Sequence, residues 1–357
     1  MTLTTTADGP DLDGVPAAVD VLLDGFFDRK AGRGRAPHLP HLVELLRAFT
    51  KGGKRLRPVL CARGWQAAGG GDPAAVLPAA ASLELFHTFA LIHDDVMDRS
   101  DTRRGRPTVH RLLAARARRH PHLLDAERFG DSGAILVGDL AMVWSDELFH
   151  DCGLPPERLA AARPFLDAMR GEVMHGQYLD VLSCTDFDSG LDAALNVIRY
   201  KTARYTVERP LQLGVALAGG GPPLLDACSA YGLPVGEAFQ LRDDVIGVFG
   251  DPAVTGKSCL DDLREGKHTA LLALALECAD AAQARTLRAL VGDPELDEEG
   301  AARIRSVLLS SGALDTVEHM ITERRRRALR ALEQAPFPAA TRSALQQLAV
   351  DATERTS

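Results

Sequence analysis

Helical periodicity recurs along almost the whole sequence, and no sustained strand pattern interrupts it. Apolar residues return every three or four positions in segments such as 17–27, 45–52 and 304–321, which is typical of amphipathic helices. Ala, Leu, Arg and Glu, all strong helix formers, dominate the chain after its first residues. Breakers rich in Gly and Pro separate these segments at 67–73, 152–157, 218–223 and 249–258. The sequence therefore predicts an all-α fold of about a dozen helices.

The overall composition excludes several classes of protein. The 357-residue chain has a formal net charge of −8, which argues against a general nucleic-acid binder but allows a local basic pocket. Six scattered cysteines without a CxxC pair predict buried thiols in a reducing compartment. No signal-peptide pattern and no apolar run near membrane-spanning length occur in the sequence. We expect a loose tail over 1–14, a single domain over 15–357 and a cytoplasmic location.

Three aspartates, Asp94, Asp95 and Asp98, follow the apolar run LELFHTFALI. On a helix, Asp94 and Asp98 lie on one face, about 6 Å apart along the axis. Like charges one turn apart repel each other, and buried carboxylates need a partner. Mg²⁺ prefers oxygen ligands and bridges one or two carboxylates to substrate phosphates. The cluster is interpreted as a magnesium site, although taken alone it fits a solvated helix end equally well.

A second acidic pair, Asp243 and Asp244, follows another apolar helical run. Two acidic clusters on separate apolar helices favour two walls of one cavity over two unrelated surface patches. Such a cavity would hold several Mg²⁺ ions around one diphosphate.

Basic segments accompany both acidic clusters. They are KGGKRLRP with Lys54, Arg55 and Arg57, TRRGRPT with Arg103 and Arg104, KTARYT with Lys201, Thr202 and Tyr205, TGKS with Lys257, and EGKHT with Lys267. Each is individually more typical of a solvated charge, but together they suit a site that neutralises two diphosphates. The sequence has no phosphate-binding loop, dinucleotide fingerprint or nucleophile elbow.

At this point the chain resembles the trans-isoprenyl diphosphate synthases, the polyprenyl synthetase family, and especially geranylgeranyl diphosphate synthases of actinobacterial type. Five motifs occur in the family's order: GGKRLRP, ELFHTFALIHDDVMDRSDTRRGRPT, GEVMHGQYLD, KTARYT and FQLRDDVIGVFGDPAVTGKSCLDDLREGKHT. The resemblance covers about residues 45 to 350. It implies an isoprenoid-synthase bundle around a central apolar cavity, several Mg²⁺ ions per site and a homodimer.

The resemblance also implies roles for individual residues. The implied metal ligands are Asp94, Asp95, Asp98, Asp243 and Asp244. The implied isopentenyl diphosphate contacts are Lys54, Arg57, His87 and Arg104. The implied allylic diphosphate contacts are Arg103, Lys201, Thr202, Gln240, Lys257 and Lys267, with Gln177 and Asp180 facing the allylic pocket. Of these, Asp94, Asp98, Arg103, Lys201, Asp243 and Lys257 are expected to be catalytic.

The implied reaction is a prenyl transfer by ionisation, condensation and elimination. Metal ions and cations stabilise the departing diphosphate, and an apolar cavity protects the allylic cation from water. The isopentenyl double bond attacks this cation, and a proton is then lost. No covalent enzyme intermediate is needed, which agrees with the missing nucleophile motif.

The second acidic motif departs from the family's common DDxxD pattern, because its fifth position is Gly247. Asp251 follows one turn later, near a Gly-Asp-Pro turn. We expect Asp243 to carry most of the second metal site and assign no ligand role to residue 247.

The product length is expected to depend on residues that precede Asp94. Phe89 and Ala90 lie five and four positions before it, and Phe86 lies about one turn further back. Farnesyl synthases without an insertion in this motif usually carry aromatics at both places, so one Phe with one Ala resembles C20 synthases. The predicted product is geranylgeranyl diphosphate. C15 or C25 and longer products remain alternatives, as does a purely structural role for Phe86 and Phe89.

Two other functions fit parts of this pattern less well. A class I terpene cyclase shares the fold class, but its second metal motif is of Asn/Ser/Glu type, and it has no use for GGKRLRP. An inactive partner subunit of a synthase would usually lack one of the two aspartate clusters, and this chain keeps both.

Overall fold

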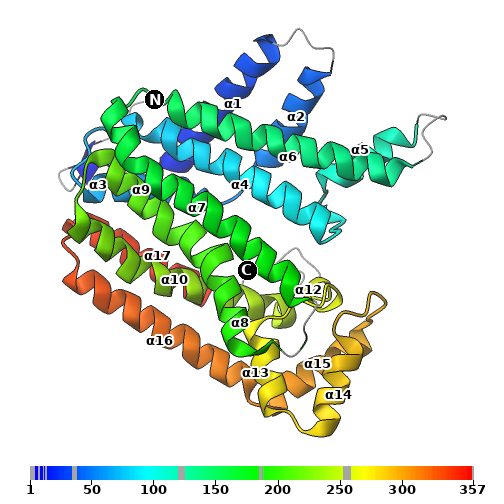
Figure 1. Ribbon diagram of the computed structural model, residues 1–357. Helices are drawn as coiled ribbons and strands as arrows, with labels where there is room; N and C mark the ends of the chain where they lie inside the picture. Colours follow the sequence, from blue (N-terminus) through cyan, green and yellow to red (C-terminus); the bar gives the residue numbers. More distant parts are fainter. Residues whose placement is uncertain are drawn as a thin grey trace. The chain divides into compact units, whose positions relative to one another are not determined.

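The computed structural model describes residues 5–6, 9–10, 12, 14–33, 38–119, 125–184, 187, 189–251 and 259–355. Almost every element in these ranges is a helix (Figure 1), which confirms the all-α prediction. The strands are four two-residue segments in two antiparallel pairs: β1 (Thr5–Thr6) with β2 (Gly9–Pro10), and β3 (Thr102–Arg103) with β4 (Arg106–Pro107).

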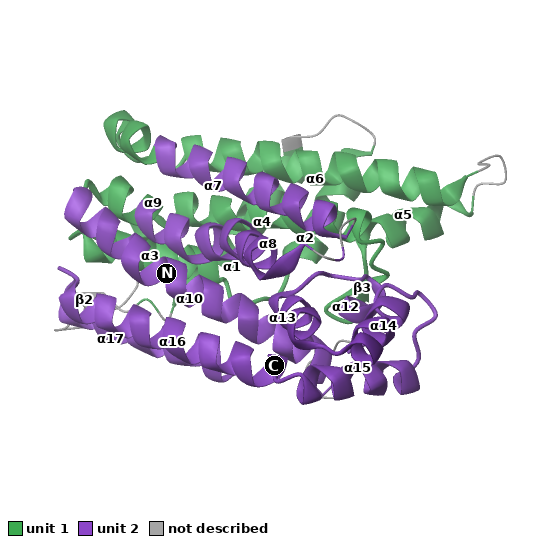
Figure 2. Cartoon of the chain, turned by 60° about the horizontal axis from the view of Figure 1, so that its bottom comes forward, with its two compact units in different colours: residues 1–162, 213–220 green, residues 163–212, 221–357 purple. Residues whose placement is uncertain are grey.

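The chain divides into two compact units, coloured separately in Figure 2. Unit 1 comprises residues 1–162 and 213–220, and unit 2 comprises residues 163–212 and 221–357. The division falls inside α7 (Pro156–Ser183) and α9 (Arg209–Ala218), so each of these helices contributes to both units. The expected single domain over 15–357 stays a prediction.

The remaining helices lie within one unit. Those of unit 1 are α1 (Val15–Arg33), α2 (Leu39–Thr50), α3 (Leu56–Ala67), the 3₁₀ turn η1 (Pro73–Ala75), α4 (Leu77–Met97), α5 (Val109–Ala117) and α6 (Ala126–His150). Those of unit 2 are α8 (Gly190–Val197), the π-helix η2 (Ile198–Glu208), α10 (Pro222–Phe249), α12 (Asp261–Arg264), α13 (Ala270–Cys278), α14 (Ala281–Leu290), α15 (Glu298–Ser310), α16 (Ala313–Gln334) and α17 (Ala339–Glu354).

The Gly- and Pro-rich breakers coincide with helix ends. Helix α3 ends where the segment 67–73 begins, α6 and α7 flank 152–157, and α9 and α10 meet at 218–223. Each break combines a Gly that terminates one helix with a Pro that begins the next, as at Pro222. These boundaries were therefore predictable from local chemistry alone.

Helix α4 is the central element of unit 1 and lies alongside α6. Its buried residues include Ala80, Leu83 and Phe86, each fully shielded from solvent. The Ser145 hydroxyl of α6 donates a hydrogen bond of 2.7 Å to the carbonyl oxygen of Ser82. This contact joins the first turns of α4 to the last turns of α6.

In unit 2, glycines allow α7 and α10 to approach the π-helix η2 closely. A Cβ atom at Gly236 of α10 would lie 2.4 Å from Ala203 Cα, and one at Gly176 of α7 would lie 2.3 Å from Lys201 N. No larger residue fits at these positions without moving the backbone. The segment KTARYT is thus held tightly from two sides, in a helix type that is often found at functional sites.

All six cysteines are free thiols, as predicted. The prediction that they are buried holds for Cys61, Cys152, Cys228 and Cys259, but it is wrong for Cys184 and Cys278, which are exposed near helix ends. Among the described residues, no helix combines the length and the apolar character that crossing a membrane requires.

A buried ion-pair network ties the start of α3 to α1 and α4. The Arg55 guanidinium donates to Glu84 Oε2 at 2.8 Å, to Asp20 Oδ1 at 2.6 Å and to the carbonyl oxygen of Thr50 at 2.6 Å. Arg55 and Glu84 are only 5% and 6% exposed. Of the four basic residues in KGGKRLRP, Arg55 therefore acts as an internal structural cation.

We expect Arg55→Met to lower the free energy of unfolding by about 3–5 kcal/mol, because the Glu84 carboxylate would stay buried without its cation. The double variant Arg55→Met/Glu84→Leu should regain most of this loss, since both charges are removed together. Chemical denaturation measures both values. Lys54→Met serves as the control, because Lys54 is exposed; an equal loss in that variant would contradict the assignment.

Candidate functional site

The first acidic cluster lies at the C-terminal end of α4. Asp94 is 15% exposed and Asp95 is only 1% exposed, while Asp98 is the residue that ends the helix. Arg103 Nε donates to Asp95 Oδ1 at 2.7 Å, and Arg103 Nη2 donates to Asp94 Oδ2 at 3.2 Å. Four predicted site residues are thus brought together in unit 1.

A tight hairpin carries Arg103 back to the aspartates. Strands β3 and β4 are joined by Arg104 and Gly105, both with positive φ angles of 53° and 70°, as in the two-residue turns that favour Gly. At the tip, Arg104 Nη1 donates to the carbonyl oxygens of Lys51 and Gly52 at 3.3 and 3.2 Å. The segments TRRGRPT and KGGKRLRP, separate in sequence, therefore meet in unit 1.

His87 lies two turns before Asp94 on α4 and is half-buried. Burial lowers the pKa of His87 well below its usual value, and the charges of Arg57, Arg103, Arg104 and Arg55 lower it further. The imidazole is therefore neutral at physiological pH, within a region of positive potential. That potential suits an anion such as a diphosphate.

The carboxylates of unit 1 fit a hard divalent cation. Asp95 Oδ2 is buried and has no hydrogen-bond partner among the described residues. Burial raises the pKa of Asp95 to about 6, against the opposing effect of Arg103 and with a further contribution from Asp94 and Asp98. In the described part of the chain, no three His, Cys, Asp or Glu side chains are placed to hold a metal by themselves. Mg²⁺ takes oxygen ligands and completes its coordination with water and substrate phosphates.

The residues predicted to set product length form a row along α4. Phe86 is fully buried, Phe89 is 8% exposed, and their ring centroids lie 5.3 Å apart. Ala90 is half-buried beside them. The structure thus places two neighbouring aromatic rings, with planes tilted by 47°, on the same helix as the first acidic cluster.

In unit 2, Lys201 and Asp180 form an ion pair. Lys201 Nζ of η2 donates to Asp180 Oδ2 of α7 at 2.6 Å. Gln177 lies three residues before Asp180, and its Nε2 is buried without a hydrogen-bond partner among the described residues. A buried amide donor in that state is costly unless a ligand accepts from it.

A hydrogen-bond relay joins η2 to the second acidic pair. Thr202 Oγ1 donates to Gln240 Oε1 at 2.7 Å, and Gln240 Nε2 donates to Asp244 Oδ1 at 2.8 Å. Burial raises the pKa of Asp244 to about 8; the Gln240 hydrogen bond opposes this, and the charges of Asp243, Asp262 and Asp180 add to it. A bound cation would offset the negative charge of these carboxylates.

Asp262 supplies a carboxylate at the place where the second motif has Gly247. A Cβ atom built at Gly247 would lie 2.0 Å from Asp262 Oδ2. The Asp262 side chain, carried by the short helix α12, therefore occupies the space that a side chain at position 247 would need. The DD pair in CLDDLREGK was the only signal in the sequence, and it was not interpreted as part of the site.

Arg355 was also missed by the sequence analysis. Its guanidinium lies 4.0 Å from the centroid of the Phe239 ring and donates to Asp243 Oδ1 at 2.9 Å. The distance of 112 residues between the two partners explains why no local pattern indicated it.

Lys267, one of the predicted lysines, pairs with an acid close to it in the sequence. Lys267 forms an ion pair of 2.7 Å with Glu265, and it borders the same small hollow as Asp262. Lys257 lies outside the described residues. The exposed Lys54 and the half-buried Arg57 flank Arg55 at the start of α3.

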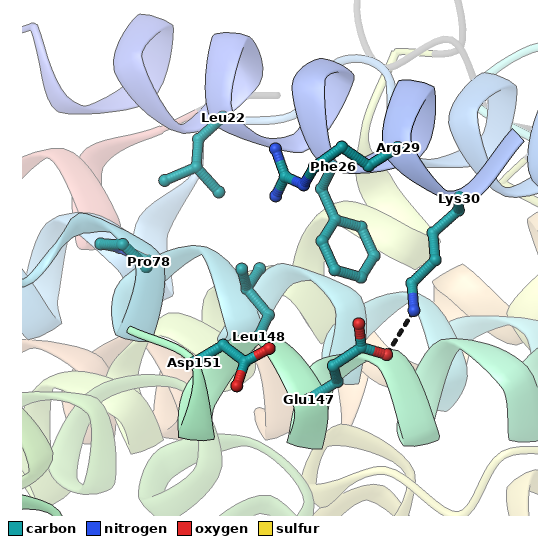
Figure 3. A pocket seen from close by; sticks show the side chains of 8 residues that line it. All are labelled: Leu22, Phe26, Arg29, Lys30, Pro78, Glu147, Leu148 and Asp151. Carbon is teal, nitrogen blue, oxygen red and sulfur yellow. Dashed lines mark hydrogen bonds and ion pairs between the residues drawn. The ribbon is translucent and has the colours of Figure 1, made fainter. Parts of the chain in front are cut away.

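Unit 1 also contains a pocket of about 350 Å³ that no predicted site residue lines (Figure 3). Its walls come from α1, α4 and the end of α6, and its lining residues are Leu22, Phe26, Arg29, Lys30, Pro78, Glu147, Leu148 and Asp151. Lys30 and Glu147 form an ion pair across it.

Comparison with known proteins agrees with this arrangement. The Polyprenyl synthetase family model matches residues 40–308. A geranylfarnesyl diphosphate synthase from Aeropyrum pernix is 36% identical over 277 residues, which cover 76% of this chain and 80% of that protein. A (2E,6E)-farnesyl diphosphate synthase from Mycobacterium bovis is 38% identical over 217 residues, which cover 61% of this chain and 55% of that protein.

A solved structure is similar over nearly the full length. The geranylgeranyl pyrophosphate synthase of Corynebacterium glutamicum, complexed with isoprenyl diphosphate and magnesium, is 44% identical with a TM-score of 0.92. The match covers 97% of this chain and 99% of that one. The chain therefore belongs to the polyprenyl synthetase family, and it is an enzyme of the trans-prenyltransferase class.

Proposed function

We propose that this enzyme is a geranylgeranyl diphosphate synthase. It condenses isopentenyl diphosphate with dimethylallyl, geranyl and farnesyl diphosphates and releases mainly the C20 product. The observation that carries the chain length is the pair of neighbouring, tilted rings of Phe86 and Phe89 beside the small residue Ala90. One aromatic and one small residue next to the acidic cluster leave more room than two aromatics would.

The relatives of this chain are named for products of different lengths. Synthases of farnesyl, geranylgeranyl and geranylfarnesyl diphosphate all match this chain at 34–38% identity. Overall similarity therefore does not separate C15, C20 and C25 products, and only residues that contact the growing tail can do so. The similarity to the Corynebacterium glutamicum protein supports C20.

Each acidic cluster is proposed to bind Mg²⁺ together with substrate diphosphate. Asp94, Asp95 and Asp98 act in unit 1, and Asp243 and Asp244 act in unit 2. When bound, Mg²⁺ stabilises the negative charge that develops on the departing diphosphate. Arg103 orients Asp94 and Asp95 through its two hydrogen bonds, and the Thr202–Gln240 relay orients Asp244.

The basic residues divide between the two substrates. Lys54, Arg57, His87 and Arg104 are proposed to bind isopentenyl diphosphate, and the meeting of KGGKRLRP with the hairpin tip supports this grouping. Arg103, Lys201, Thr202, Gln240, Lys257 and Lys267 are proposed to bind the allylic diphosphate. Gln177, whose buried amide needs an acceptor, and Asp180 complete that pocket.

Asp262 is proposed to replace the fifth aspartate of the second motif. Its Oδ2 lies where a side chain at residue 247 would begin, and its charge adds to the raised pKa of Asp244. The carboxylate is thus delivered from α12 instead of α10. Asp251 is not needed for this role.

The active enzyme is proposed to be a homodimer that forms through α6. Phe129, Leu136 and Val143 are 46%, 67% and 57% exposed, and they lie seven residues apart on one side of this helix. Such spacing is typical of a seam between two helices, and a second copy of α6 would bury all three.

The first test is a product analysis. Purified enzyme with isopentenyl diphosphate and each allylic primer should give a C20 alcohol after dephosphorylation, and a chelator should abolish it, because diphosphate departure needs the metal. Mass spectrometry sizes the products. Another chain length would overturn the C20 proposal alone, and no condensation with any primer would overturn the catalytic assignment.

A carboxylate exchange tests Asp262. Asp262→Ala should raise the Mg²⁺ concentration for half-maximal activity by about tenfold or more, as losses around a metal site do. Gly247→Asp/Asp262→Ala should recover most of it, because the carboxylate then comes from α10. Titration calorimetry with Mg²⁺ and a non-reactive diphosphate gives an independent readout. Asp251→Ala is the matched control; a larger effect there would reverse the assignment.

Replacing one exposed leucine of α6 by a charged residue tests the proposed dimer interface. Leu136→Glu should convert the dimer to a monomer in light scattering after size exclusion, because a buried unpaired carboxylate is costly. Leu309→Glu is the control, since Leu309 is also a well-exposed leucine, 56% exposed on α15. A monomeric wild-type enzyme, or an unchanged mass in Leu136→Glu, contradicts this interface.

A further inference from the structure

The row of rings on α4 continues beyond Phe89 to His93. The Phe86 and Phe89 centroids lie 5.3 Å apart, and the Phe89 and His93 centroids lie 4.6 Å apart in an edge-on arrangement. Phe89 therefore has a ring on both sides along the helix. His93 directly precedes Asp94 and has no assigned role in the reaction.

Contacts with helix α6 fix the orientation of the His93 ring. His93 Nε2 lies 3.0 Å from the carbonyl oxygen of Ile135 and 3.6 Å from Asp139 Oδ1. Because a carbonyl oxygen only accepts, Nε2 carries the proton and donates. The orientation of the ring is therefore set by the backbone of α6.

Gly138 makes the space for this ring. A Cβ atom at residue 138 would lie 2.3 Å from His93 Cδ2 and 2.4 Å from His93 Nε2. Even an alanine would thus force the imidazole away from α6. The close contact between α6 and His93 therefore requires glycine at residue 138.

We infer that His93 is a positioning residue for product length, held by Ile135 and Gly138 of α6 and bracing the ring of Phe89. The inference rests on the proposed function, in which the growing tail meets Phe89. A brace matters because an aromatic side chain next to a void can change rotamer, and neighbours relax into a cavity. When Phe89 is fixed between two rings, its side chain stops the growing tail at one chain length.

The inference predicts opposite effects for two substitutions. His93→Ala removes the brace, so Phe89 can turn into the vacated space and the floor opens toward longer products. Gly138→Ala pushes the imidazole off α6 and against Phe89, which should shift the distribution toward shorter products. In the double variant the alanine methyl at 138 partly fills the void left by His93, so the distribution should move back toward wild type.

The test compares product distributions at equal turnover for His93→Ala, Gly138→Ala and the double variant. Phe89→Ala, which should lengthen the product, is the positive control. His150→Ala is the matched control, because His150 also packs edge-on against a phenylalanine, Phe149, at 5.7 Å in unit 1. The ratio of long to short products should rise severalfold in His93→Ala, fall severalfold in Gly138→Ala and stay constant in His150→Ala.

The outcomes separate this inference from the C20 proposal. A wild-type product other than C20 overturns only that proposal, because the shifts are measured relative to wild type. Unchanged ratios in active His93→Ala and Gly138→Ala variants, with Phe89→Ala lengthening the product, overturn the brace. A thermal unfolding scan of each variant identifies effects of lost stability, which change the rate but leave the ratio unaltered.

Discussion

The structure depends on how it holds carboxylates that repel one another at the ends of apolar helices. Asp95 is nearly inaccessible to solvent next to Asp94 and Asp98, a placement that costs free energy unless a cation is near. The β3–β4 hairpin brings Arg103 back to provide that cation. In unit 2, Asp244 accepts a hydrogen bond from the neutral amide of Gln240, and burial raises its pKa. The two clusters are therefore stabilised to different degrees before any substrate arrives.

Much of the fold could be predicted from sequence because its signals are local. Helical periodicity and the breakers at 152–157 and 218–223 decide where helices begin and end, and the spacing of Asp94 and Asp98 places both on one face. Composition also predicts the free thiols, but not that Cys184 and Cys278 are exposed, since exposure depends on what packs over each helix end.

The parts that could not be predicted depend on contacts between distant segments. The sequence shows four equivalent cations in KGGKRLRP, and only the fold reveals that Arg55 is buried against Glu84. Likewise, the hydrogen bond from Arg355 to Asp243 joins residues 112 positions apart. The π-helical segment KTARYT packs closely against glycines on α7 and α10, which are distant in the sequence. Local pattern can identify such residues as important, but it does not identify their neighbours.

The space beside Gly247 shows that an acid from another helix can stand where a linear motif lacks one. The oxygen of Asp262 stands where the missing side chain would begin, so a loss at one position of the chain is matched by an acid 15 positions later. A rule that sorts members of this family into active and inactive subunits by counting aspartates in each motif would score this chain as degenerate. Sorting by which acids converge in space would count Asp262 with the second motif, as it would an acid on the following short helix of any relative that has glycine at this position.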